Sequence, residues 1–154
     1  MSAQTDPPIE DERERLNRNF AELLQEVRVA QTGVQILFAF LLTLPFTNRF
    51  STVGGRDIAV YSLSVTGAAV ATVCLVAPVS YHRLVFRSGR KPELVGAASA
   101  LAQVGTAAFG LALISGVFLI ADVVLGLGWA IGAAVVLAGL AATLWYILPL
   151  ARGR

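Results

Sequence analysis

Residues 94–121 read LVGAASALAQVGTAAFGLALISGVFLIA, and none of these 28 side chains is charged. The runs 29–48, 58–81 and 123–151 are likewise free of Asp, Glu, Lys and Arg. A helix needs about 20 predominantly apolar residues to cross the hydrocarbon core of a bilayer, and each run reaches that length. The sequence therefore predicts a polytopic membrane protein.

The composition of the chain agrees with this class. Of 154 residues, 56% are hydrophobic and 14% are charged, whereas about 25% are charged in an average soluble domain. The N-terminal residues mix acidic, basic and polar side chains, unlike the basic and then apolar pattern of a secretory signal. The single cysteine, Cys74, excludes a disulfide framework. No basic block with interleaved aromatic residues suggests nucleic acid, so the expected partner is the lipid bilayer.

The spacing of the apolar runs predicts an all-α fold, an integral membrane four-helix bundle with an amphipathic cytoplasmic helix at its N-terminus. The expected spans are about 29–46, 58–81, 94–121 and 129–150. Short connections, including a tight turn around residues 122–128, make successive spans antiparallel. We expect residues 1–8 to be disordered and residues 151–154 to form a cytoplasmic tail.

An amphipathic segment, residues 9–28, precedes the first span. Its apolar side chains recur at helical spacings of three and four: Leu16, Phe20, Leu23, Leu24 and Val27. No helix breaker follows it, so the sequence predicts either one long helix or a bend along the membrane surface near Arg28. The apolar face either docks a partner or packs against the membrane or the chain itself.

The basic residues predict the orientation of the chain in the membrane. Ten of the twelve Lys and Arg residues lie on the side of the two termini and the loop 82–93, whereas Arg49 and Arg56 lie on the other. Cytoplasmic loops carry an excess of basic residues. We therefore expect a multi-pass protein of the plasma membrane with both termini in the cytoplasm.

Uncharged polar side chains recur at one depth within the spans. Gln31 and Gln35 share a face of the first span, and Thr72, Gln103 and Thr143 lie in the other three. At the helical rise per residue, Gln35 and its counterparts lie roughly 10–15 Å from the cytoplasmic boundary. We expect these five side chains to face the bundle interior and bond across it, each bond contributing about 0.5–2 kcal/mol. A solvated pathway or a ligand pocket is the alternative.

The ionisable residues lie at the ends of the spans rather than in their middle. Glu26, Arg28, His82 and Arg83 are expected at the cytoplasmic boundary. His82 either bonds a headgroup or a loop carbonyl there, or titrates near neutral pH. A proton- or sodium-coupled carrier ordinarily needs a carboxylate near the midplane. The neutral interior therefore counts against transport.

The sequence carries no motif with the spacing that catalysis requires. It contains no phosphate-binding loop, no zinc-ligand spacing and no paired catalytic carboxylates. We therefore expect no enzymatic activity, no cofactor and no metal site.

Small residues recur every four positions in the last two spans. Ala108, Ala112 and Gly116 follow this spacing, and so do the pairs Gly128 and Gly132, and Gly139 and Thr143. Such spacing lets helix backbones approach closely. It indicates either packing between the third and fourth spans or the seam of a homo-oligomer.

Four motifs resemble a family of small actinobacterial membrane proteins of unknown function. They are ELLQEVRV at 22–29, TGVQILFAFLL at 32–42, LPF at 44–46 and YHR at 81–83. The resemblance covers most of the chain and implies four spans. Some relatives carry a sodium/proton antiporter label.

The residues and the resemblance leave two function hypotheses. The first is a non-enzymatic structural or partner-binding membrane component, either a homo-oligomer or bound to another membrane protein. The second is a small ion or proton transporter or channel. In that case Gln31, Gln35 and Gln103 would line the route, with Glu26 and His82 at its mouth.

Overall fold

The computed structural model describes residues 12–85 and 91–152, and within them every long element is a helix. The main helices are α1 (Glu12–Thr43), α2 (Gly55–Val85), α3 (Lys91–Leu125) and α4 (Leu127–Ala142). The last continues through a π-helical turn, η3 (Thr143–Ile147), into α5 (Leu148–Arg152), and two 3-10 turns, η1 (Leu44–Phe46) and η2 (Phe50–Thr52), precede α2. Segment 1–8 lies outside the described residues.

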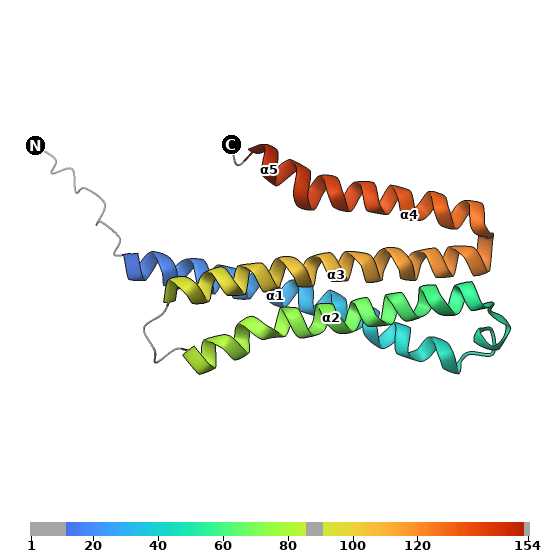
Figure 1. Cartoon of the computed structure of the whole chain (residues 1–154), viewed down its shortest axis with the longest axis horizontal. Helices are drawn as coiled ribbons and strands as arrows, with labels where there is room; N and C mark the ends of the chain where they lie inside the picture. Colours follow the sequence, from blue (N-terminus) through green and yellow to red (C-terminus); the bar gives the residue numbers. More distant parts are fainter. Residues whose placement is uncertain (1–11, 86–90, 153–154) are drawn as a thin grey trace, which may run out of the picture.

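The helices supply four stretches that are long and apolar enough to cross a membrane. These are Ala21–Phe46, Gly55–Ser80, Gly96–Leu125 and Leu127–Arg152. Successive helices run antiparallel, so that the start of α1 and the end of α5 lie at one end of the molecule, which we call the terminal end (Figure 1). The opposite end, which holds η1, η2 and the link to α4, is the loop end. The predicted all-α class with four spans is confirmed.

The amphipathic segment and the first span form one helix. α1 continues through Arg28 without a break, which decides between the two predicted alternatives. Val27 is buried and Leu23 packs against the same cluster, so this part of the apolar face packs against the chain itself.

The connection between α3 and α4 is shorter than the predicted turn at 122–128. Gly126 is the only residue between the two helices, and its φ of 93° is a conformation that glycine adopts without steric cost. Its N–H donates to the carbonyls of Ala121 and Asp122, each 3.1 Å away, which caps the end of α3. Asp122 therefore belongs to α3.

The core is formed by α1, α2 and α3. Three residues of α1 are buried at intervals of seven: Val27, Val34 and Leu41. The first two pack against Ala71 and Leu75 of α2. Leu41 packs instead with Ala68 and Ala112 in a second buried cluster. The heptad interval is the spacing of a helix packed along its length.

Glycines set the closest approach in this core, between α2 and α3. A Cβ on Gly105 would lie 2.8 Å from Cγ of Leu75, and one on Gly67 would lie 3.2 Å from the carbonyl oxygen of Ala108. A Cβ on Gly116 would lie 3.2 Å from Oγ of Ser64. The small residues of α3 therefore pack against α2, whereas the sequence analysis considered packing against the fourth span.

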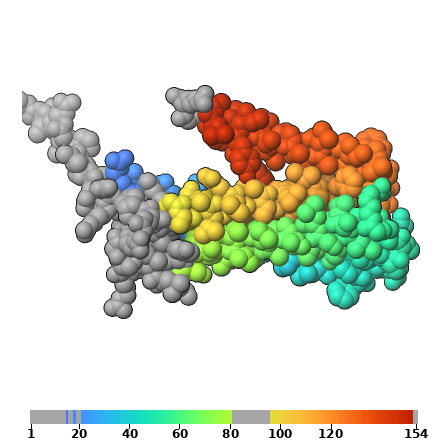
Figure 2. All heavy atoms as spheres, viewed as in Figure 1, coloured from blue at the N-terminus to red at the C-terminus, as the bar shows by residue number. Residues whose placement is uncertain are grey.

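The fourth helix is attached to one neighbour. Among the described elements α4 packs against α3 and not against α1 or α2. Figure 1 shows α4 diverging from α3 toward α5, and Figure 2 shows its last part standing apart from the other helices except where side chains bridge the space. Ala130, near the loop end, is the only buried side chain of α4.

Candidate functional site

Gln31 links α1 to α2. Its Nε2 donates to the main-chain carbonyl of Leu75 at 3.0 Å, and the side chain is half-buried. Pro78, buried in α2, lacks the N–H that would bond the carbonyl of Cys74, next to Leu75. Polar side chains of neighbouring helices commonly stabilise a transmembrane helix where proline interrupts it. Gln31 thus supplies a hydrogen bond in the turn that Pro78 weakens.

Two further cross-helix bonds come from residues that the sequence analysis did not select. Ser64 Oγ donates to the carbonyl of Ala112 at 2.7 Å and is fully buried. Tyr61 Oη donates to the carbonyl of Leu41 at 3.1 Å. Both donors lie on α2. This helix has apolar residues on every side, so its sequence does not show which hydroxyl faces a neighbouring helix.

The remaining predicted belt residues do not meet in the interior. Thr72 is half-buried and donates to the carbonyl of Ala68, 2.8 Å away in its own helix. Gln35 and Thr143 are exposed, and neither makes a side-chain hydrogen bond with any described residue. Their expected place in the interior is wrong for the single chain, because each lies outside the face that its helix packs. Gln35 follows the buried Val34 by one residue, about 100° around the helix.

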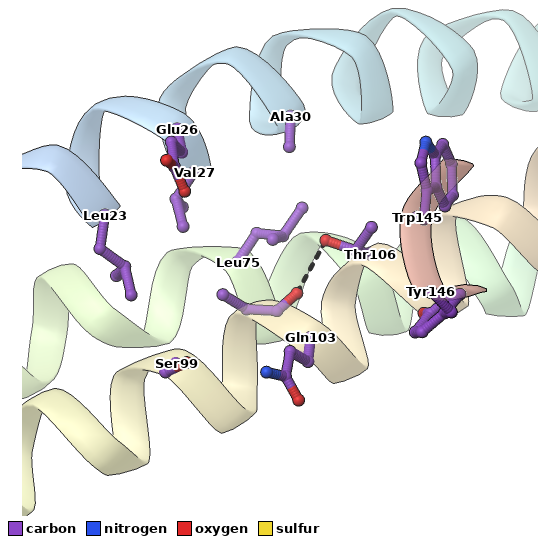
Figure 3. A pocket seen from close by; sticks show the side chains of 11 residues that line it. Leu23, Glu26, Val27, Ala30, Leu75, Ser99, Gln103, Thr106, Trp145 and Tyr146 are labelled. Atoms are coloured by element: carbon purple, nitrogen blue, oxygen red, sulfur yellow. Dashed lines mark hydrogen bonds between the residues drawn. The ribbon is translucent and has the colours of Figure 1, made fainter. Parts of the chain in front are cut away.

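Gln103 is also exposed, so its expected interior place is wrong too, but it lines a hollow at the terminal end. This terminal cavity has a volume of about 310 Å³ (Figure 3). Its walls are apolar side chains of α1, α2, α3 and η3, and polar groups from three helices: Glu26, Ser99, Gln103, Thr106 and Tyr146. Thr106 Oγ1 donates to the carbonyl of Ala102 at 2.9 Å. Ser99, Gln103 and Thr106 of α3 thus border the space that the divergence of α4 opens.

Trp145 forms one wall of this cavity. A Cβ on Gly110 would lie 3.0 Å from Cζ3 of Trp145, so the indole seats against the bare backbone of α3. Its ring stacks with that of Phe109 at a centroid distance of 6.4 Å and an interplanar angle of 14°. Trp145 therefore reaches back to α3 from η3, where α4 has left the bundle.

The boundary residues divide into two groups. Both Glu26 and Arg28 are exposed, but Glu26 lines the terminal cavity and Arg28 does not. A separation of two residues corresponds to a rotation of about 200° around a helix. Glu26 and Arg28 therefore leave α1 in nearly opposite directions. For His82 and Arg83 only the helical backbone is described, and their side chains lie outside the described part of the chain.

The two basic residues of the loop end both contact α3. Arg56 forms an ion pair with Asp122, whose side chain is only 6% exposed. The Nε of Arg56 also lies 3.8 Å from Oδ1 of Asp57. Arg49 Nη2 donates to the carbonyl of Val123 at 3.4 Å. A cation is favourable at the C-terminus of a helix, where the carbonyls point outward. These contacts hold the α1–α2 connection against the end of α3.

Two further hollows are almost wholly apolar. One of about 250 Å³ lies at the loop end between η1, η2 and α3, with Arg49 at its rim. The other, of about 140 Å³, lies between α3 and α4 beside Trp145. Within residues 12–85 and 91–152, no group of His, Cys, Asp and Glu side chains is placed to hold a metal ion.

The chain matches a protein family over most of its length. A family model described as "Family of unknown function (DUF6328)" matches residues 9–149. No curated protein and no solved structure matches the chain.

Proposed function

We propose that this chain, which belongs to the DUF6328 family of unknown function over residues 9–149, is a non-enzymatic integral membrane component that acts by associating with a second copy of itself. The seam would be the face of α4 turned away from α3. The excess of basic residues at the terminal end supports an orientation in the plasma membrane with both termini cytoplasmic.

One observation carries this proposal: the glycines of α4 all face away from the bundle. A Cβ added to Gly128, Gly132 or Gly139 would meet nothing within 4 Å. Glycine costs about 1 kcal/mol relative to alanine in a helix interior. None of these glycines is needed for the packing of α3 on α4, so close approach of a further helix is the role left to them.

The glycines belong to a continuous outward face. Its members recur at intervals of three and four residues and are all exposed: Gly128, Gly132, Val135, Val136, Gly139 and Thr143. Lipid is as apolar as a leucine side chain, so helices in a membrane associate through close van der Waals contact and polar bonds. The hydroxyl of Thr143, which bonds no described residue, would gain a partner in such a contact.

Energy transfer between copies labelled at the N-terminus, in vesicles of decreasing protein-to-lipid ratio, tests the proposal. The wild type should retain transfer on dilution, and Gly132→Leu should lose it. Gly96→Leu is the matched control, because Gly96 of α3 also faces open space but lies outside the α4 face. Transfer that vanishes on dilution of the wild type, or survives in Gly132→Leu, would contradict self-association through α4.

A small ion or proton transporter is the second candidate, and the terminal cavity favours it. Gln103 of the predicted route and Glu26 of its predicted mouth line this cavity. Gln31 instead bonds the Leu75 carbonyl, and Gln35 faces outward. Proteoliposome flux that Gln103→Leu abolishes would favour transport over the first proposal.

A further inference from the structure

The terminal cavity has the size and walls of a small-molecule site. Its volume of about 310 Å³ lies at the lower end of the range of about 300–1,000 Å³ for such sites. Leu23, Val27, Ala30 and Leu75 provide apolar walls from α1 and α2. Trp145 adds an aromatic ring that Gly110 and Phe109 hold in place. An apolar body of modest size therefore fits between α1 and η3.

The charge of the cavity selects the ligand further. Among the described residues that line it, Glu26 is the only charged one. A carboxylate at the wall attracts a cationic group and repels an anionic one. A phospholipid headgroup also needs a partner for its phosphate, and no basic side chain is among these lining residues. The cavity therefore suits a cation without a phosphate group.

The polar and apolar groups are separated along the cavity. In Figure 3, Glu26 lies toward one end with Leu23, and Trp145 and Tyr146 lie at the other. Ser99 and Gln103 line the α3 wall. From this geometry we propose that the cavity binds an amphipathic organic cation, with its ammonium group beside Glu26 and its apolar body against Trp145. This proposal does not depend on self-association through α4.

Trp145 offers a direct probe of binding. The chain has two tryptophans, and Trp129 is exposed near the loop end, so Trp129→Phe leaves Trp145 as the sole reporter. The purified protein in a non-ionic maltoside detergent is titrated with benzyltrimethylammonium and, separately, with neopentylbenzene. The second compound replaces the charged nitrogen by carbon and keeps the shape. We expect a saturable change in Trp145 emission for the cation and a much weaker one for the neutral compound.

Matched variants test the role of Glu26. Glu26→Gln in the Trp129→Phe background should raise the dissociation constant about tenfold, which corresponds to about 1.4 kcal/mol. Glu22→Gln is the control, because Glu22 is an exposed carboxylate of the same helix that does not line the cavity. It should leave the dissociation constant unchanged.

A third variant tests the location of the bound compound. Ser99→Phe places a ring in the cavity from α3 and should abolish the emission change. Saturable binding that survives Ser99→Phe would place the cation elsewhere and overturn the proposal. So would equal affinity for neopentylbenzene, equal effects of Glu26→Gln and Glu22→Gln, or the absence of any saturable change.

Discussion

Gln31 of α1 donates its side-chain amide to the main-chain carbonyl of Leu75 in α2, 3.0 Å away. Gln35, one turn further along α1, is exposed and makes no such bond with a described residue. The two glutamines therefore have different roles although they share a helix and a residue type. The first joins two helices in a turn that Pro78 interrupts.

This pair gives the first prediction. Gln31→Leu should lower the free energy of unfolding by about 0.5–2 kcal/mol, because it removes an interhelical bond and leaves the turn before Pro78 without its added donor. Gln35→Leu, the matched control, should leave the stability of the single chain unchanged within about 0.5 kcal/mol. Unfolding in bicelles, followed by circular dichroism, measures both. Equal losses for the two variants would contradict the assignment.

The second prediction concerns the contact of α2 with α3. Gly105→Ala would place a Cβ 2.8 Å from Cγ of Leu75, so the Leu75 side chain or one of the two helices must shift. Overpacking of this kind costs about 1–3 kcal/mol. Gly96→Ala, at a helical position with open space around it, should instead stabilise by up to about 1 kcal/mol. The same unfolding measurement distinguishes the two signs, and a neutral Gly105→Ala would show that the interface is loose.

The ion pair at the loop end gives the third prediction. Asp122 is nearly buried and Arg56 is largely exposed, so solvent screens the pair only in part. We expect a double-mutant cycle of Asp122→Ala and Arg56→Ala to give a coupling energy of about 1 kcal/mol. The coupling should decrease at high salt, because screening weakens exposed charges. Additive losses at every salt concentration would mean that the pair contributes nothing to stability.

The number of helices and their order could be predicted from the sequence because uncharged runs of sufficient length report directly on the bilayer. The helices extend beyond the predicted spans, since helical hydrogen bonds continue past the hydrocarbon boundary. The sequence predicted that the third span ends at residue 121, because the polar Asp122 follows. The helix α3 continues to Leu125. Hydropathy locates the lipid, whereas the backbone geometry of Gly126 ends the helix.

The orientation of each polar side chain was harder to predict. α1 has a packed face at Val27, Val34 and Leu41, and this heptad interval could have shown that Gln35 lies beside the face rather than within it. α4 offers no such signal, because it is apolar on every side. Only the structure shows that Gly132 faces outward and that Trp145 returns to α3.

Cysteine cross-linking tests self-association through α4 most directly. In a Cys74→Ala background, which removes the only native thiol, a cysteine replaces Gly132 or, as a control, the exposed Leu111 of α3. Membranes are then treated with copper phenanthroline and the covalent dimer is quantified. We predict an abundant dimer for Gly132→Cys and little for Leu111→Cys. No dimer for Gly132→Cys, or equal yields for both variants, would contradict the proposed seam.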